Sequence, residues 1–482
     1  MARRFFFPLV LCFFLLLPAA AQVGDPHSTH SRAPSAAVCA RCIRAHLQYL
    51  ASDAMRGRGS ATPDELRAAN YIARLLRRYG IKPAGDNGGY LQRLRLVKRT
   101  LLRPPRLRLS MTGRPPVPWT HGKEFIALRM AQAAVSGPLR KIDLAETDLP
   151  QEDAPSEAGA VVLLDAHGGN PKAAITEAVN AGAAAVLVSE YPDARKRWQE
   201  YASRIPKLRM LIAGISKEAQ GPASTVAVVS ADAVAALEEM ADGTQVTLRA
   251  PERIEISNTR NVVGMIRGSD PALAHSAVLL SAHMDHLGVG APVNGDSIYN
   301  GADDDASGTV AVLELARLLG ARRQPRRTVI FALFGSEELG ALGGTYFREH
   351  PPLPLKDIAA NLEFEMIGRA DPAVAPDTLW LTGWERSNLG PVLAEHGARL
   401  VSDPHPQQNF FARSDNYALA QKGVVAQTVS SYGLHGDYHQ PSDDVAHIDF
   451  KHMDEAIGSL LGPIEWLVNS DFRPEWKPGG KP

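Results

Sequence analysis

Short apolar runs recur along the second half of the chain and alternate with amphipathic stretches. Five runs have the length of buried strands: Ala277–Ala282, Thr328–Phe334, Ile358–Met366, Thr378–Leu381 and Val424–Val429. Between the first two, Ala311, Leu315 and Leu318 share one face of a predicted helix over Ala306–Leu319, and Gly320 ends it. This alternation predicts an α/β fold with a mixed, largely parallel central sheet flanked by helices.

Two helices are predicted near the N-terminus. The first covers Ile43–Ala51. The second has Thr62 as its N-cap, Pro63 at its first position and Glu65 completing a capping box, and it stops before Gly80.

The middle of the chain repeats the α/β pattern on a smaller scale. A strand at Gly159–Leu164, a helix at Lys172–Ala181 and a strand at Ala183–Val188 predict a parallel βαβ unit. We therefore expect an inserted smaller α/β domain within a catalytic domain. The predicted segments are 1–21 (signal peptide), 22–116 (first part of the catalytic domain), 117–250 (insert) and 251–482 (catalytic domain).

The first residues have the pattern of a secretory signal peptide. Arg3 and Arg4 precede the apolar run Phe5–Leu17, and the small residues Ala19–Ala21 provide a cleavage site. The run is shorter than the roughly 20 residues that span a bilayer. We expect export to the periplasm or the extracellular space without stable membrane insertion. An uncleaved anchor is the alternative.

Charge and cysteine content argue against two classes of function, nucleic-acid binding and thiol redox chemistry. Lys and Arg total 52 and Asp and Glu total 52, a balance that argues against a dedicated nucleic-acid binder. The basic segment 93–129 interleaves charge with apolar residues, which favours solvated strand edges over a nucleic-acid patch. Cys39 and Cys42 form a Cys-x-x-Cys pair without a thioredoxin-like context, so we interpret them as structural or incidental.

Histidines and carboxylates follow the predicted strands. They are His283 and Asp285, then Asp303–Asp305, then Glu337 and Glu338, then Glu363 and Glu365, and finally Asp437, His439 and Asp443. In parallel sheets, ligands bind beyond the carboxyl ends of the strands. Imidazole and carboxylate suit zinc, and two ions can bind an attacking hydroxide and polarise a carbonyl. The sequence therefore predicts a hydrolytic metal site.

Five motifs carry a family resemblance. They are His283-x-Asp285, Gly301-Ala302-Asp303-Asp304-x-Ala306-Ser307-Gly308, Glu337-Glu338, Glu365-Met366-Ile367-Gly368 and His439-x-Pro441-x-Asp443. In order and spacing they resemble the zinc-dependent aminopeptidase family, which includes secreted bacterial leucyl aminopeptidases, glutamate carboxypeptidase, glutaminyl cyclase and the transferrin receptor. The insert resembles a protease-associated domain.

The resemblance implies a ligand set for two zinc ions per chain. Asp304 would bridge the ions. His283 and Glu338 would complete one site, and Glu365 and His439 the other.

It also implies roles for residues around the metals. Glu337 would be the general base, and Asp285 would hold the ring of His283. Asp443 would support the His439 loop in a similar way, and Arg413 and Tyr438 are candidates for contacts to the transition state or the substrate.

Two positions depart from the family pattern. Glu365 stands where aspartate is common, and Glu363 lies two residues earlier on the same strand face, so the two glutamates are alternatives for one ligand. Ser414-Asp415-Asn416 stands where Ser-Asp-His is frequent. That histidine is not a ligand in the pattern, so the zinc assignment is unchanged.

We expect an exported two-zinc aminopeptidase that removes N-terminal residues from peptides by attack of a metal-bound hydroxide. A glutamate-carboxypeptidase-like exopeptidase is the alternative. A non-catalytic receptor is less favoured, because all five ligand positions hold competent residues. A glutaminyl cyclase-like enzyme is less favoured, because such enzymes work with one zinc and lack the double-aspartate pattern kept here. Peptides are the expected partners, without nucleic acid. The oligomeric state and the preferred N-terminal residue stay open.

Overall fold

The structure is a computed structural model that describes residues 37–143, 158–166, 169–216, 220, 225–431, 433 and 435–482. The predicted signal peptide, residues 1–21, lies outside these residues. In the part of the chain that is described, no helix is both long and apolar enough to cross a membrane.

A large mixed sheet forms the centre of the catalytic part. Its order is β19-β18-β20-β17-β13-β16-β12-β2-β9, with β1 also paired to β12. Pairs β20–β17, β17–β13 and β13–β16 are parallel, whereas β12 pairs antiparallel with β16 and β2. The strands are β1 (Lys82–Pro83), β2 (Leu91–Leu101), β9 (Leu211–Ile212), β12 (Glu252–Ile266), β13 (Ala277–His283), β16 (Thr328–Phe334), β17 (Ile358–Phe364), β18 (Leu379–Leu381), β19 (Leu400–Ser402) and β20 (Val425–Ser430). The expected mixed α/β sheet is confirmed, but it is parallel mainly at its centre, because β18 also pairs antiparallel with β20 and β2 with β9.

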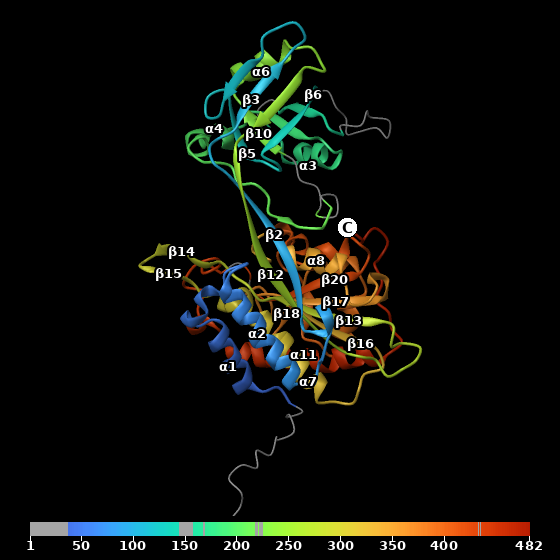
Figure 1. Cartoon of the computed structure of the whole chain (residues 1–482). Coiled ribbons are helices and arrows are strands. Elements are labelled where there is room, and N and C mark those ends of the chain that lie inside the picture. Colours follow the sequence, from blue (N-terminus) through green and yellow to red (C-terminus); the bar gives the residue numbers. More distant parts are fainter. Residues whose placement is uncertain are drawn as a thin grey trace, which may run out of the picture. The chain divides into compact units, whose positions relative to one another are not determined.

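Successive residues of the central strands enter two different cores. Val278 and Leu280 of β13 pack with one set of helices, and Leu279 of the same strand packs with another. The first set is α1 (Ala40–Leu50), α2 (Pro63–Arg78), α7 (Gly308–Gly320), α9 (Leu389–Glu395) and α11 (Phe450–Asn469), and the second is α8 (Leu342–Glu349) and α10 (Asn416–Ala420). Figure 1 shows α1, α2, α7 and α11 grouped on one side of this sheet. The unbroken apolar runs thus reflect strands that are buried on both faces.

Local signals predicted most element boundaries. The Thr62 hydroxyl accepts hydrogen bonds from the N–H groups of Asp64 and Glu65, as expected for an N-cap. Glu65 reaches back to the N–H of Ala61, one residue earlier than a standard capping box requires. Strand β17 ends at Phe364 instead of Met366, because Met366 has a positive φ of 54° that breaks the strand.

Helix α7 begins two residues later than expected. Residues Ala302–Ser307 form a wide turn in which Asp304 and Asp305 are not helical, and α7 starts at Gly308. The aspartate run therefore lies in a turn at the helix entrance, where its side chains can point in different directions.

The predicted insert contains a sheet with its own cores. Within the described residues its order is β4-β3-β11-β6-β7-β8-β10-β5. Its elements are β3 (Arg106–Ser110), β4 (Val117–Thr120), β5 (Phe125–Arg129), β6 (Ala134–Asp143), β7 (Val161–Asp165), α3 (Lys172–Asn180), β8 (Ala185–Ser189), α4 (Pro192–Lys196), α5 (Trp198–Ala202), β10 (Thr225–Val229), α6 (Ala231–Glu238) and β11 (Gln245–Arg249). The βαβ prediction is confirmed by β7, α3 and β8, whose strands pair in parallel.

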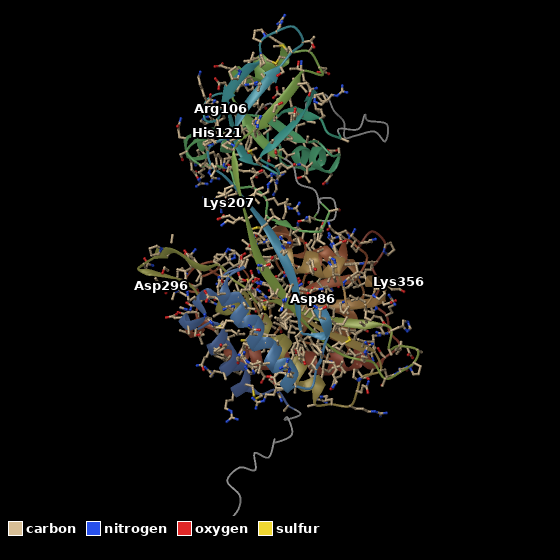
Figure 2. The ribbon with its side chains drawn as sticks, viewed as in Figure 1. Asp86, Arg106, His121, Lys207, Asp296 and Lys356 are labelled. Atoms are coloured by element: carbon tan, nitrogen blue, oxygen red, sulfur yellow. A yellow bond between two sulfur atoms is a disulfide. The ribbon has the colours of Figure 1, made fainter. Side chains whose placement is uncertain are left out.

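The second sheet starts before the predicted boundary at residue 117. Strand β3 pairs antiparallel with both β4 and β11, which places residues 106–110 in this sheet. Arg106, on β3, and His121, which follows β4, are labelled in this part of the chain (Figure 2). Leu107 and Leu109 face its core whereas Arg106 and Arg108 are exposed, so the predicted alternation is confirmed. The expected strand edge is wrong for β3, because this strand is paired on both sides.

Two smaller features complete the catalytic part. Cys39 and Cys42 form a disulfide at the start of α1. Strands β14 (Gly288–Val293) and β15 (Asp296–Tyr299) form a separate antiparallel hairpin between β13 and the aspartate turn.

Gly308 tests how tightly α7 packs at its first turn. A Cβ there would meet the carbonyl oxygen of Phe364 and lie 2.5 Å from Asp305 Oδ1. We expect Gly308→Ala to lower the free energy of unfolding by about 3 kcal/mol through overpacking. Gly458→Ala in α11 is the matched control, because its Cβ would make only an ordinary 3.6 Å contact with Val38. Chemical denaturation should show no loss for the control, and equal stability of both variants would contradict this packing.

Candidate metal centre

The parallel strand order brings the predicted site residues to one edge of the sheet. His283 is the last residue of β13, and Glu337 and Glu338 follow the end of β16. Glu365 comes directly after β17, and the loop that carries His439 follows β20. Because these four strands are parallel neighbours, their carboxyl ends meet there.

Asp304 lies between two of the predicted histidine ligands. Its Oδ1 is 3.1 Å from His283 Nε2, and its Oδ2 is 3.1 Å from His439 Nε2. Burial alone would raise the pKa of Asp304, but the nearby imidazoles of His286, His283 and His439 lower it well below its usual range. One carboxylate therefore presents its two oxygens to two different nitrogen donors, which is the geometry that a bridging ligand needs.

The other two aspartates of the run bind backbone N–H groups. Asp303 Oδ1 accepts from Gly368 at 2.7 Å, and Asp305 Oδ1 accepts from Gly308 at 3.0 Å and Met366 at 3.1 Å. Asp303 and Asp305 thus hold the turn, and Asp304 faces the histidines.

The structure pairs the predicted ligands differently from the resemblance-based assignment. Glu338 Oε2 lies 3.2 Å from His439 Nε2, so Glu338 shares the Oδ2 side of Asp304 with His439 and not with His283. Burial and the nearby Asp304 act to raise the pKa of Glu338, but hydrogen bonds from His286 and His439 lower it overall. The correction follows from the loop after β20, which carries His439 to the end of β16, a contact that sequence order does not show.

Glu365 lines the cavity beside the site, together with Asp304 and Glu337. Glu363 is fully buried behind it and accepts a hydrogen bond from the N–H of Asn416 at 2.5 Å. Burial raises the pKa of both glutamates. Of the two alternatives, Glu365 is the one in a position to bind an ion in the cavity.

Glu337 lines the same cavity and has the properties of a general base. Burial raises its pKa well above the usual value, opposed by His283 and reinforced by Asp415 and Glu365. A carboxylate with a raised pKa accepts a proton readily near neutral pH.

Asp285 orients the Glu337–Glu338 turn more directly than it orients His283. Its Oδ1 is 3.8 Å from His283 Nδ1, beyond hydrogen-bond distance. The same carboxylate accepts the N–H of Glu337 at 3.0 Å, that of Glu338 at 3.3 Å and the hydroxyl of Ser60 at 2.6 Å. Its strongest contacts therefore fix the backbone that carries the predicted base.

Asp443 ties the His439 loop to the aspartate turn. Its carboxylate accepts the N–H groups of Asp303 and Asp304, each at 3.0 Å. Arg369 lies 3.4 Å from Asp443 Oδ1 and 2.7 Å from Asp437 Oδ2, so it joins both ends of the loop. Asp443 thus acts on the backbone of the predicted bridging residue as well as on the loop.

Arg413 and Tyr438 both line the cavity. The Tyr438 ring stacks on His439 at 3.9 Å, and the Arg413 guanidinium lies 5.0 Å from the Phe410 ring centroid. Both face the space in which a substrate would sit, so both stay candidates for substrate contacts.

Sequence reasoning missed His286 and Arg58. His286 is fully buried, and its Nδ1 lies 2.8 Å from Glu338 Oε1. Arg58 is also buried and donates hydrogen bonds to the carbonyls of Leu50, Met284, Asn300 and Gly301. His286 stood in the same run as His283 and could have been noticed, whereas no local pattern points to Arg58.

The donor atoms fit zinc. Asp304 Oδ1 is buried and accepts no hydrogen bond, although His283 Nε2 is 3.1 Å away. Donors separated by 3.1–3.2 Å match two ligands of one zinc ion, whose bonds measure about 2.0–2.2 Å. Among the described residues, His286, Asp304 and Glu338 also offer ligand atoms within 4.8 Å of one another.

Residues 261–461 match the model of peptidase family M28. The matched segment contains the five predicted metal ligands, Glu337 and Asp285.

Related proteins match over part of their length. The aminopeptidase NAALADL1 of Rattus norvegicus is 35% identical over 112 residues, which are 22% of this chain and 13% of that protein. An aminopeptidase of Pseudomonas aeruginosa is 36% identical over 113 residues, or 23% of this chain and 19% of that protein. These alignments thus cover less than a fifth of either relative. The aminopeptidase from Aneurinibacillus sp. strain AM-1 shares the fold, with a TM-score of 0.52 at 18% identity over 90% of this chain and 94% of that one.

Glu65 is expected to make stability depend on pH. Its carboxyl is buried behind the Glu337 turn, where it accepts hydrogen bonds from Thr259 at 2.8 Å and Ser336 at 3.0 Å. Burial and the nearby Asp285 raise its pKa from 4.5 to about 8. Between these pH values the folded chain keeps a proton that the unfolded chain releases, so this contribution to stability falls as pH rises.

We expect Glu65→Gln to remove that contribution. The melting temperature of the metal-free wild type should fall more steeply from pH 5 to pH 8 than that of the variant. Over these three pH units, the free energy of unfolding of the wild type should fall by at most about 4 kcal/mol more than that of the variant, because one pKa unit is worth about 1.4 kcal/mol. The control Glu395→Gln, at an exposed position of α9, should keep the wild-type slope. Identical slopes for Glu65→Gln and wild type would refute the buried, protonated carboxyl.

Proposed function

We propose that this chain is an exported two-zinc aminopeptidase that removes N-terminal residues from peptides. The observation that carries the proposal is Asp304, whose two carboxylate oxygens face His283 and His439 separately. Glu338 lies beside His439, and Glu365 lines the adjoining cavity. We assign Asp304, Glu338 and His439 to one ion and Asp304, His283 and Glu365 to the other.

The residues around these ligands support a hydrolytic mechanism. When bound, the two ions would activate water and polarise the carbonyl of the scissile peptide bond. Glu337 would take the proton from that water on its carboxylate and deliver it to the leaving amine. Asp285 holds the Glu337 N–H at 3.0 Å, which fixes the base relative to the ligands. Arg413 or Tyr438 would contact the developing negative charge.

The cavity suits an N-terminal residue with an apolar side chain. Its wall includes Met366, Trp380 and Phe410, with the last two rings stacked at 5.4 Å. Its polar end carries the carboxylates of Glu337 and Glu365. A carboxylate near the reacting bond favours a free α-amino group, which is positively charged.

A glutamate-carboxypeptidase-like activity is the second candidate. The observation in its favour is Arg413, a cation that lines the cavity and could bind a substrate carboxylate. Within the described lining it faces three acidic side chains, those of Asp304, Glu337 and Glu365. This excess of acids makes the aminopeptidase our first choice.

Export rests on the N-terminal signal pattern. The Cys39–Cys42 disulfide supports it, because disulfides persist in oxidising compartments.

Zinc content and peptide cleavage test the proposal directly. We expect about two zinc ions per chain by elemental analysis and release of the first residue from an unblocked peptide. An N-acetylated version of the same peptide should be resistant, because it lacks the free amine. Absence of bound metal, or equal cleavage of the two peptides, would refute the proposal. If the N-acetylated peptide ends in glutamate, release of that C-terminal glutamate would favour the carboxypeptidase.

Two neighbouring variants separate the base from the ligand. Glu337→Gln should keep both zinc ions and lose at least about a hundredfold in kcat, because general-base catalysis typically supplies 10²–10⁴. Glu338→Ala should instead lose zinc from one position. Retained turnover in the first variant would remove Glu337 as the base, and full zinc occupancy in the second would remove Glu338 as a ligand.

A further inference from the structure

A second histidine lies three residues after His283 and reaches the same centre. His286 is fully buried, and its Nδ1 is 2.8 Å from Glu338 Oε1. The same nitrogen is 3.8 Å from Asp304 Oδ2. Neither the motifs nor the mechanism above use this side chain.

The backbone on both sides fixes the position of the His286 ring. The His286 N–H donates to the carbonyl of Arg58 at 3.3 Å, and its own carbonyl accepts the N–H of Ser60 at 3.2 Å. The ring packs against Gly301, where a Cβ would lie 2.5 Å from the His286 Cγ. Gly301 also has a positive φ of 59°, so glycine is favoured there both by the lack of space for a Cβ and by the backbone conformation. The ring is therefore held against the aspartate turn.

The surroundings of the two ring nitrogens indicate which one carries the proton. His286 Nε2 is buried and has no hydrogen-bond partner, whereas Nδ1 faces a carboxylate oxygen. A neutral imidazole has one N–H donor and one acceptor. With the proton on Nδ1, the Nδ1–H group donates to Glu338 Oε1, and only the acceptor Nε2 is left without a partner. Binding of Nδ1 to a metal would instead leave a buried N–H without an acceptor, which costs about 1–3 kcal/mol.

This proton gives the two oxygens of Glu338 different partners. Oε1 accepts from His286 at 2.8 Å, and Oε2 lies 3.2 Å from His439 Nε2. Both histidine rings thus contact one carboxylate from different sides, with ring centroids 5.6 Å apart. The oxygen next to His439 is left to bind an ion.

We propose that His286 is a positioning residue that holds Glu338 through Oε1 and so sets the zinc affinity of the position formed by Asp304, Glu338 and His439. The inference rests on the proposed two-zinc function, because it needs Glu338 to be a ligand. It adds an assignment for His286 and a separate task for each oxygen of Glu338. Hydrogen bonds to metal ligands typically change metal affinity or activity by 10–100-fold when they are removed.

Two substitutions at His286 separate positioning from ligation. His286→Asn places an amide N–H close to the position of Nδ1, so it can still donate to Glu338. His286→Leu has a similar size and no donor. His46→Leu is a control, because His46 on α1 is a partly buried histidine that binds Tyr71 and Tyr79, away from the metal ligands.

The measurement is zinc binding by the full-length, metal-depleted protein in competition with a coloured chelator. We expect His286→Leu to weaken one of the two zinc ions by 10–100-fold and to leave the other within about threefold of wild type. His286→Asn should restore the weakened position to within about fivefold of wild type. His46→Leu should bind both ions as the wild type does, even if it melts at a lower temperature. Cobalt spectra of the Asn variant should keep the wild-type band positions.

Three results would overturn the inference. Unchanged zinc binding by His286→Leu would show that Glu338 needs no such support. An Asn variant as weak as the Leu variant, with a shifted cobalt spectrum, would identify His286 as a ligand instead. Equal weakening of both ions would indicate a general loss of structure. Failure of the proposed function is seen separately in the wild type, as absence of zinc or of cleavage of unblocked peptides.

Discussion

Burial of many carboxylates at the ends of four parallel strands is the constraint on which the catalytic part depends. Asp285, Glu363 and Asp415 are 0% exposed, and Asp304 is 2% exposed. A carboxylate that leaves water without a hydrogen bond or a counter-charge costs several kcal/mol. Each acid in this region therefore needs a specific partner, and these partners define the architecture of the site.

Backbone N–H groups satisfy most of these acids. Asp303, Asp305, Asp443 and Asp285 each accept a hydrogen bond from the main chain of a neighbouring loop. These four bonds join segments that are distant in sequence. The acids that remain directed at imidazole nitrogens or at the cavity are those assigned to metal binding and proton transfer. Bound divalent cations would supply the positive charge that these acids lack.

Arg58 provides a second, opposite kind of support. Its buried guanidinium donates to carbonyls that flank His283 and precede the aspartate turn, including those of Met284 and Gly301. It fixes the backbone of two loops that carry predicted metal ligands. The loops are thus held from one side by a cation on carbonyls and from the other by carboxylates on N–H groups. This support from both sides holds the nitrogen and oxygen atoms of predicted ligands as close as 3.1–3.2 Å to one another.

The sequence by itself determined the elements and the types of donor. Unbroken apolar runs predicted strands buried on both faces, and β16 has the predicted bounds Thr328–Phe334. The motifs around His283 and Glu337 lie at the ends of the parallel strands β13 and β16, so their convergence was predictable from parallel pairing alone. The later start of α7 was not predictable, because the turn over Ala302–Ser307 depends on contacts with Asp443 and Gly368.

Only the tertiary structure decided which donors lie together. The family resemblance implied that Glu338 shares an ion with His283, whereas the folded chain places Glu338 between His439 and His286. Asp285 likewise contacts the Glu337 turn more closely than the histidine two residues before it. The physical reason is the range of the interactions. Strand and helix signals arise from neighbours in sequence, but hydrogen bonds at strand ends join loops that only the completed sheet brings within hydrogen-bond distance.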